Sequence, residues 1–147
     1  MTKGMKGQSN HSLDAKGRLI IPTRFREGLG SKFVLCFGMD NNLYIYPQDE
    51  WDKFSEKLNT LPISDPNARR FKTFFQGSAC DCEVDSHFRI VISPALRKHA
   101  GIDKDVVMVG NGSIVEIWNT EAWDKYNSPE EMDIDAISKE MSSLYGI

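Results

Sequence analysis

The stretch DAKGRLIIPTRFREGLG at residues 14–30 recurs as DSHFRIVISPALRKHAG at residues 85–101, and this repeat decides the fold. Over an offset of 71 positions without a gap, the two stretches share an Asp, an Arg four residues later, three aliphatic residues, a second Arg and a closing Gly. The second copy then has one additional residue, which raises the offset to 72 positions. At this offset LYIY at 43–46 aligns with VEIW at 115–118, and WDK at 51–53 aligns with WDK at 123–125. Matches in this order indicate an internal duplication, so the chain holds two copies of a unit of about 50 residues.

Each copy predicts the same short elements. The aliphatic run after the first Arg is typical of a buried strand. Pro22 or Pro94 then opens a brief helix, because a proline at the first helical position gives up no hydrogen bond, and Gly30 or Gly101 ends that helix as a left-handed cap. Further strands are expected at 33–37, 43–46, 106–109 and 115–118.

A unit of this size is too small to bury its own apolar faces well. We therefore expect the two copies to interlock around one barrel-like core. The predicted fold class is mainly β with helices (α+β), built from an internally duplicated unit.

The repeats divide the chain into four segments. They are a first repeat at 7–53, linking helices at 54–77, a second repeat at 78–125 and an acidic C-terminal helix at 128–147. Apolar residues at helical spacing predict helices over 48–61 (Trp51, Phe54, Leu58, Leu61) and 66–75 (Phe71, Phe74, Phe75). The tail helix is expected from Pro129 to Leu144, with Glu130, Glu131 and Asp133 in its first turn, where acidic groups suit the helix dipole.

Composition limits the class of protein. The 147 residues are 40% hydrophobic and carry a formal net charge of −3, which excludes a wholly disordered chain. No apolar run approaches the roughly 18 residues that a membrane span needs. The first ten residues are basic but no apolar stretch follows, so we expect no secretory signal, no membrane partner and a cytoplasmic location.

The charge is distributed unevenly along the chain. Residues 1–32 hold seven basic groups against two acidic ones, whereas residues 102–147 hold three basic groups against ten acidic ones. A basic end on an otherwise acidic chain indicates a local surface for a polyanion.

The motif Asp14-Ala-Lys-Gly-Arg18 has two interpretations. Asp14 can close a turn by accepting backbone N–H groups or by pairing with Arg18, which is a purely structural role. The surrounding positive charge of Lys16, Arg24 and Arg26 favours a second role for Arg18, because clustered Arg and Lys on turns bind phosphates and guanine edges.

Enzymatic and metal-binding functions find little support. The chain has no phosphate-binding glycine loop, no nucleophile elbow and no metalloprotease spacing. Asp14 and Asp85 could face each other as a hydrolytic carboxylate pair, but the Arg beside each would keep both ionised. Cys80 and Cys82 are expected to be reduced, half-buried thiols on a strand, not zinc ligands. We therefore predict no enzyme activity, no cofactor, no metal and no small-molecule substrate.

The stretches HSLDAKGRLIIPTRFRE (11–27), LYIYPQDEW (43–51) and CEVDSHFRIVISPALRKHAGI (82–102) resemble the MraZ family of bacterial transcriptional regulators, in the AbrB-like, swapped-hairpin DNA-binding group. The resemblance covers nearly all of residues 7–127. It implies an intertwined double-split β-barrel with accessory helices and assembly into a homo-oligomeric ring. It also implies binding of double-stranded DNA at short direct repeats upstream of the division and cell-wall gene cluster, mostly as a repressor, and association with the nucleoid.

Residue by residue, the resemblance carries a role onto the first motif. Arg18 is expected to enter the DNA, with Lys16 beside it on the backbone, Gly17 in the turn and Asp14 as the structural member. Arg24 and Arg26 match the basic residues of the following helix.

Asp85 and Arg89 match the second motif, which departs from the family pattern. Phe88 stands where the family usually has a Gly before the Arg. Because Phe88 is bulky and favours β structure, we expect no turn with positive φ at this position. Arg89 is therefore expected either to bind DNA or to pair structurally with Asp85.

Two other functions remain open at this point. One is an antitoxin-like protein that binds DNA and also inhibits a toxin through its acidic tail. The other is a protein-interaction module of the same fold with little DNA reading.

Overall fold

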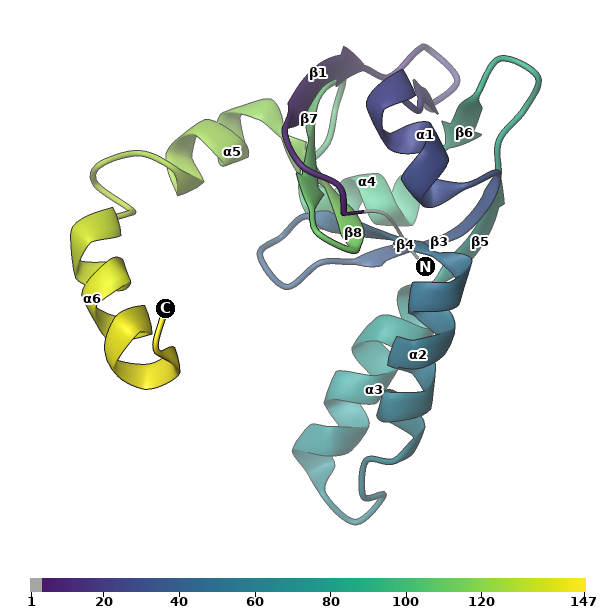
Figure 1. Ribbon diagram of the computed structural model, residues 1–147. Helices are drawn as coiled ribbons and strands as arrows, with labels where there is room; N and C mark the ends of the chain where they lie inside the picture. Colours follow the sequence, from purple (N-terminus) through teal and green to yellow (C-terminus); the bar gives the residue numbers. More distant parts are fainter. Residues whose placement is uncertain (1–3) are drawn as a thin grey trace.

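The two repeats exchange strands in the computed structural model, which describes residues 4–147 (Figure 1). The first repeat contributes β1 (Gln8–Ser12), β2 (Arg18–Ile20), α1 (Thr23–Leu29), β3 (Lys32–Phe37), β4 (Leu43–Pro47) and α2 (Gln48–Asn59). After α3 (Pro66–Ser78), the second repeat contributes β5 (Cys80–Glu83), β6 (Arg89–Val91), α4 (Pro94–Ala100), β7 (Asp105–Asn111), β8 (Ile114–Asn119) and α5 (Thr120–Tyr126), and α6 (Ile134–Tyr145) follows.

Strand pairing between the repeats builds the sheets. Within the described residues, one sheet has the order β1-β7-β8-β4-β3-β5 and a second consists of β2 and β6, with every pair antiparallel. The first strand of each repeat pairs with the third strand of the other: β1 lies on β7 and β5 lies on β3. The internally duplicated α+β fold with interlocked copies is therefore confirmed.

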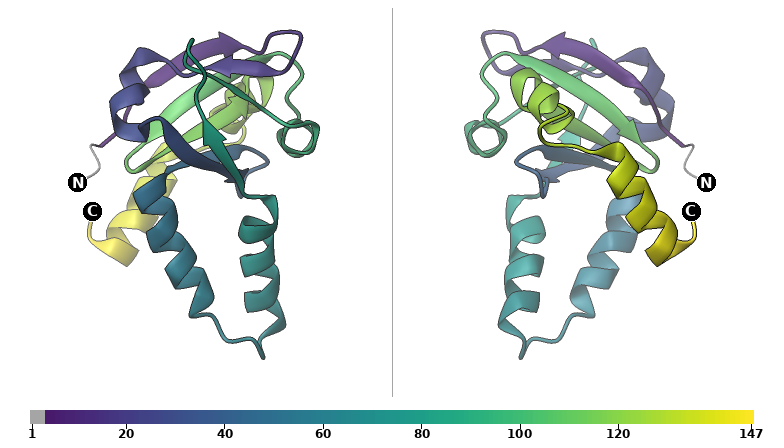
Figure 2. Two further views of the ribbon diagram at one scale, coloured as in Figure 1. Left: turned by 90° about the vertical axis from the view of Figure 1, so that its right-hand side faces the viewer. Right: turned by 90° about the vertical axis from the view of Figure 1, so that its left-hand side faces the viewer.

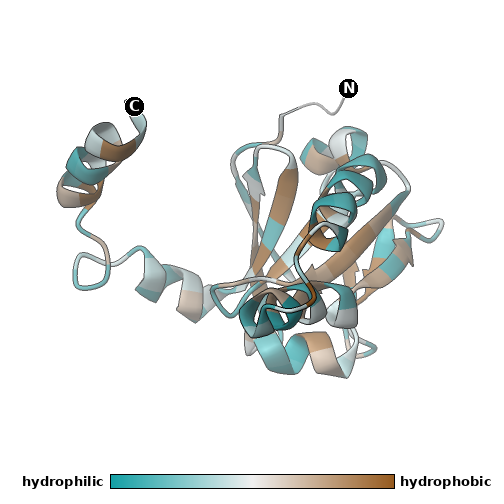
Figure 3. Cartoon of the chain, turned by 90° about the horizontal axis from the view of Figure 1, so that it is seen from below, coloured by the Kyte–Doolittle hydropathy of each residue, from teal (hydrophilic) through white to brown (hydrophobic). Residues whose placement is uncertain are grey.

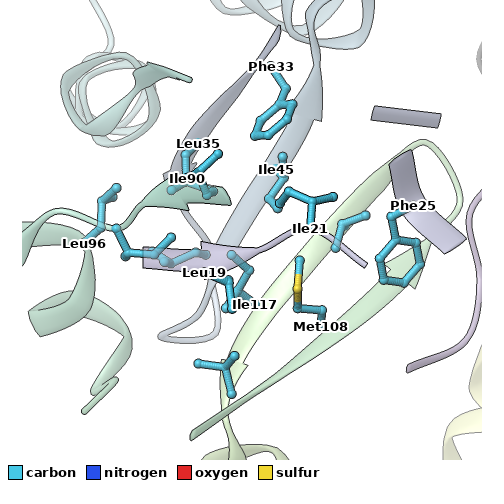
Figure 4. Close-up of a cluster of buried hydrophobic side chains, with 14 of the residues drawn as sticks. Leu19, Ile21, Phe25, Phe33, Leu35, Ile45, Ile90, Leu96, Met108 and Ile117 are labelled. Atoms are coloured by element: carbon cyan, nitrogen blue, oxygen red, sulfur yellow. The ribbon is translucent and has the colours of Figure 1, made fainter. Parts of the chain in front are cut away.

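The core lies between the sheets and the two short helices. The first and third residues of the aliphatic run after each motif arginine point into it, and Leu19 and Ile90 face each other across the β2–β6 pair. Phe25 of α1 and Leu96 of α4 close the core from the corresponding position of each repeat (Figure 4). Each such buried side chain contributes about 1.5–3 kcal/mol, so both repeats are needed to stabilise the β2–β6 pair.

Helices α2 and α3 form a hairpin that projects from the strands β3 and β4 (Figures 1 and 2). Trp51, Leu58 and Phe75 are buried in a second, smaller core between the hairpin and the sheet. This confirms the helix predicted from residue 48, and it places the predicted boundary between residues 53 and 54 inside α2. Phe71, predicted on the apolar face, is 43% exposed.

The tail helix begins later than its composition predicts. α6 starts at Ile134, where the Asp133 side chain accepts the Ala136 N–H as an N-cap, and the preceding residues form a turn that brings the Met132 N–H to the Ser128 carbonyl. The prediction of a start at Pro129 was wrong, because an aspartate cap is a stronger start signal than a proline with no capping partner. None of the twelve residues of α6, all of them described, is buried.

Local backbone predictions were met in part. Gly101 ends α4 in the left-handed region (φ 62°, ψ 29°), as expected, whereas Gly30 ends α1 at φ 74° and ψ −167°, outside that region.

Cys80 and Cys82 are half-buried on β5, and burial raises the pKa of Cys82 to about 11. In the described part of the chain no three His, Cys, Asp or Glu side chains gather as metal ligands.

Within residues 4–147, no helix has the length and apolar character needed to cross a bilayer.

Candidate nucleic-acid interface

The first Asp-x-x-x-Arg motif is a tight turn that leads into β2. Oδ1 of Asp14 accepts the backbone N–H groups of Lys16 and Arg18, both at 2.9 Å, and Oδ2 accepts Nε of Arg18 at 2.6 Å. The Gly17 N–H donates to the Asp14 carbonyl, and Gly17 adopts φ 75°, which glycine reaches without strain. The structural role expected of Asp14 is thus visible in its contacts.

The second motif repeats this geometry. Oδ1 of Asp85 accepts the N–H groups of His87 and Arg89, and Oδ2 accepts Nε of Arg89 at 2.9 Å. Phe88 donates its N–H to the Asp85 carbonyl and adopts φ 57°. The prediction that Phe88 excludes a positive-φ turn was wrong, because the hydrogen bonds around Asp85 outweigh the cost of that conformation for a bulky residue.

Both carboxylates are held in their charged form. Hydrogen bonds lower the pKa of each, first the backbone N–H of Arg18 for Asp14 and the backbone N–H of Arg89 for Asp85. The two ion pairs are about one-third exposed, so solvent screens them and each contributes little to stability. The main effect of each ion pair is to orient its arginine. The Asp accepts a hydrogen bond from Nε, which leaves the terminal amino groups of the guanidinium outside this bond.

A two-stranded ribbon joins the two turns. β2 and β6 pair with Arg18 opposite Val91 and Ile20 opposite Arg89, and the ribbon is extended by the Ile92 N–H donating to Gly17 O and the Ile21 N–H donating to Phe88 O. Because alternate residues of a strand share a face, Arg18, Ile20, Arg89 and Val91 line the outer face. Arg18 and Arg89 are diagonal neighbours on it. The Cα atoms of such neighbours are typically about 7–8 Å apart.

The site lies at one end of the molecule. Both turns are at the end opposite the α2–α3 hairpin, with one turn at each end of the ribbon (Figures 1 and 2). Two of the large apolar side chains beside them are exposed, Ile20 at 39% and Val91 at 60%. The outer face of the ribbon therefore presents basic and apolar side chains to solvent, whereas the side chains of its inner face are buried in the core.

Each turn is flanked by an arginine from the helix of the other repeat. Arg26 of α1 places its guanidinium carbon 4.0 Å from the centre of the Phe88 ring. Arg97 of α4, at the matching position in the duplication, has its guanidinium carbon 3.5 Å from the point that a Cβ on Gly17 would occupy. Arg97 was missed as a site residue, although the 71-residue offset that aligns it with Arg26 was a signal for it.

The other predicted basic residues are distributed differently. Lys16 is exposed on the first turn, next to Arg18. Arg24 is also exposed, but its guanidinium lies against Gly7, with the whole of β1 between that point and the turn. Lys3, counted in the basic N-terminal segment, lies outside the described residues.

Taken together, the ribbon, its turns and the flanking helices form what we call the ribbon face. Its basic members are Lys16, Arg18, Arg26, Arg89 and Arg97, and its acidic members are Asp14 and Asp85. The acidic members are both occupied by hydrogen bonds from within the turns. The excess positive charge therefore faces outward, which suits an anionic partner.

Comparison with known proteins gives the family. The family model described as "MraZ protein, putative antitoxin-like" matches the chain twice, at residues 5–74 and 75–144, one match for each repeat. The chain is 45% identical over 140 residues to "Transcriptional regulator MraZ" of Caldanaerobacter subterraneus subsp. tengcongensis, covering 95% of this chain and 98% of that protein.

Two further relatives agree with this match. A protein of the same name from Thermoanaerobacter sp. is 44% identical over 140 residues, covering 95% of this chain and 98% of the relative, and one from Clostridium beijerinckii is 45% identical over 138 residues, covering 94% and 96%. These names describe regulators and not enzymes, in agreement with the sequence-based prediction. Since the family model and the relatives both extend over almost the full length, this chain belongs to the MraZ family.

Proposed function

We propose that this protein is a sequence-specific, DNA-binding transcriptional regulator that reads DNA with the ribbon face. The observation that carries the proposal is the placement of Arg18 and Arg89 side by side on the outer face of β2 and β6, each oriented by an Asp of its own turn. The names of the relatives, all of them transcriptional regulators, support the same assignment.

The proposed contacts follow from the chemistry of the ribbon face. The major groove of B-DNA, about 12 Å wide, admits a two-stranded ribbon, and an arginine there bonds bidentately to the O6 and N7 atoms of guanine. Arg18 and Arg89 are the proposed base readers, with the exposed Ile20 and Val91 as apolar neighbours for thymine methyl groups. Lys16 contacts the backbone beside the Gly17 turn. Arg26 adds positive charge beside the second turn, and Arg24, whose guanidinium lies against Gly7, adds it farther from the first turn.

The resemblance to the family supports finer proposals. They are a homo-oligomeric ring, short direct repeats upstream of the division and cell-wall gene cluster as the DNA target, repression as the effect, and a cytoplasmic, nucleoid-associated location. One ribbon offers few positive groups, so a single copy binds weakly at cytosolic salt. A ring that engages several DNA boxes makes each further contact intramolecular, which raises the overall affinity by about a hundredfold or more.

The most direct test of DNA reading is fluorescence anisotropy on DNA upstream of the protein's own gene, with scrambled DNA as competitor. Wild type should bind specifically and lose affinity as salt rises, and Arg18→Ala should lose specific binding while keeping the circular dichroism and mass of the wild type. Arg70→Ala is the matched control, because Arg70 is an exposed arginine of α3 on the other side of the molecule. If wild type bound scrambled DNA with the same affinity, the ribbon face would be a basic patch without sequence specificity.

A second measurement tests the ring. Probes with one box and with several boxes should differ in affinity by about a hundredfold or more, as linked sites do. Equal affinity for both probes would contradict the proposal that several copies bind together.

The antitoxin-like or protein-interaction alternative is favoured by one observation, the unburied apolar side chains of the tail helix α6. Under this alternative a small protein would co-purify in fixed ratio with the full chain and would be lost when residues 128–147 are deleted. DNA binding that survives the deletion unchanged, with no such partner, would favour the regulator alone.

A further inference from the structure

The two turns differ in how their flanking arginines are held. We infer that Arg97 and the first turn form a separate phosphate-binding subsite for the DNA backbone, and that Phe88 prevents Arg26 from forming its counterpart at the second turn. The inference rests on the proposed DNA-reading function and adds to it a residue that neither the motif nor the comparisons assign.

Arg26 is held at two points. Its Nε donates to the Ile21 carbonyl at 2.8 Å, and its guanidinium carbon lies 4.0 Å from the centre of the Phe88 ring. A guanidinium over an aromatic face is attracted by the ring quadrupole and gives up part of its hydration. Arg26 is therefore engaged within the protein and has one face covered.

Arg97 occupies the matching place without either contact. Its neighbour in the turn is Gly17, which has no side chain to cover it, and its Nε is buried with no acceptor among the described residues. Buried donors in folded proteins nearly always have a partner, and an orphan donor is a reason to look for an acceptor from outside the chain. The guanidinium of Arg97 is thus the one of the pair that can turn toward an incoming anion.

The surroundings favour a phosphate over a base edge. Arg97 lies against Gly17 of the first turn and is not on the ribbon, whereas Arg18 is on the outer face that would enter the groove. Lys16 is exposed on the same turn, and Asp14, the nearest acidic group of the turn, is already bound to Arg18. Two cations beside a turn, with its carboxylate occupied, make a site for a backbone phosphate, and such contacts position DNA without reading its sequence.

The experiment measures DNA affinity of the full chain as a function of salt, because the slope of log K against log salt counts the phosphates that are contacted. Arg97→Ala should lower the magnitude of this slope by about one and weaken specific and scrambled DNA alike. Arg97→Lys, which keeps the charge, should restore most of the slope. Lys98→Ala is the control, because Lys98 lies on the same helix beside Asn41 and Gly101 and away from the turn; its slope should equal that of the wild type.

Variants of Arg26 and Phe88 form the second part of the experiment. Arg26→Ala should change the slope clearly less than Arg97→Ala in the wild-type background. In a Phe88→Gly background, where the ring is removed and the turn keeps its backbone, Arg26→Ala should lower the slope by about one. The same small effect in both backgrounds would overturn the role given to Phe88.

Three outcomes separate this inference from the function on which it rests. A wild-type slope in Arg97→Ala, with the circular dichroism spectrum intact, would overturn the subsite and leave DNA reading by Arg18 standing. A loss of the slope in Arg97→Ala that Arg97→Lys does not restore would also overturn it, because a structural role would then explain the loss. Failure of the wild type to bind any DNA would overturn the proposed function and the subsite together.

Discussion

Phe88, on the second turn, adopts φ 57°, in the left-handed region of the backbone. A non-glycine residue in the left-handed region costs roughly 1–2 kcal/mol, and a bulky one is rare there. At φ 57° Phe88 is held by its own N–H bond to Asp85, by the Ile21 N–H on its carbonyl and by Arg26 over its ring. Propensity predicts the preference of an isolated residue, but two of these contacts, from Ile21 and Arg26, come from the first repeat, which no local rule includes.

The strain at Phe88 leads to a stability prediction. Phe88→Gly and Phe88→Ala both remove the ring, but only glycine also removes the strain of a Cβ at positive φ. The glycine variant should therefore be more stable than the alanine variant by about 1 kcal/mol. Urea denaturation of the two variants measures the difference, and an alanine variant equal to or more stable than the glycine variant would mean that residue 88 does not adopt positive φ in solution.

The carboxylates of the turns lead to a prediction about pH. Because hydrogen bonds hold the pKa of Asp14 and Asp85 below the ordinary value of 3.8, the folded state favours their charged form. Their contribution to stability is present above the ordinary pKa and disappears as the pH falls through the lowered one. The stability difference between wild type and the Asp14→Asn, Asp85→Asn double variant should be constant from pH 7 to 5 and shrink below about pH 4.

Urea denaturation of both proteins across this pH range measures that difference. A difference that grew on acidification would contradict the hydrogen-bonding pattern of the turns. DNA affinity should show no step from these two groups between pH 8 and 5, since both stay charged there.

Among the elements, the tail helix α6 has the most unusual surroundings. Figure 3 shows apolar and polar residues alternating along this helix. At helical spacing its large apolar residues fall on one side, and they are exposed on the chain taken alone: Ile134, Ile137, Leu144 and Tyr145. A stripe of this kind normally packs against another surface. In the proposed homo-oligomer, we expect that surface to belong to a neighbouring copy.

This arrangement predicts the effect of charges on the stripe. Ile137→Asp with Leu144→Asp should lower the oligomer mass measured by light scattering, because two charges would enter a buried contact. The circular dichroism spectrum of the folded chain should not change, since none of the described residues of α6 is buried in the barrel. Ser143→Asp, on the opposite side of the helix, is the control and should keep the wild-type mass, whereas an unchanged mass in the double variant would contradict the contact.

Local sequence patterns predicted most of the helices and strands named above, but not every helix end or exposed side chain. The strand after each motif, the helix that follows it and the helix starting at residue 48 were predicted from periodicity and proline or glycine signals, and their bounds agree closely with the structure. The start of α6 was misplaced because Pro129 and the acidic residues after it resemble a first turn, while the actual start depends on the Asp133 side chain reaching the Ala136 N–H. The 43% exposure of Phe71 depends on the angle between α2 and α3, which periodicity does not determine.

At the scale of the whole molecule, strand exchange makes the repeats mutually dependent. The pairs β1–β7, β3–β5, β4–β8 and β2–β6 all join one repeat to the other. The connection through the α2–α3 hairpin is therefore not what holds them together. Duplication and the small size of each unit were enough to predict this interlocking from the sequence.

Cleavage of the connecting loop tests this dependence. A protease site inserted after Ile63, which is 84% exposed at the tip of the hairpin, should yield two fragments that elute together under native conditions and separate in urea. Separation of the fragments without denaturant would contradict the interlocked fold. An uncut sample of the same insertion variant controls for the effect of the added residues.

The crossing of arginines between repeats could not be predicted in the same way. The alignment pairs Arg26 with Arg97, but that each one serves the turn of the other repeat follows only from the strand exchange in three dimensions. The motif residues Arg18 and Arg89 were identified individually, whereas their diagonal placement on one ribbon depends on the register of β2 and β6. Sequence repeats thus identified the motif residues of the ribbon face but not Arg97, and the fold defines their arrangement.

The central claim is that the ribbon face binds DNA, and hydrogen–deuterium exchange of the full chain with and without operator DNA tests it most directly. Peptides that cover residues 13–20 and 85–92 should exchange more slowly when DNA is bound, with no change at the α2–α3 tip around residues 60–66. Protection confined to that tip or to α6, with the two turns unchanged, would contradict it.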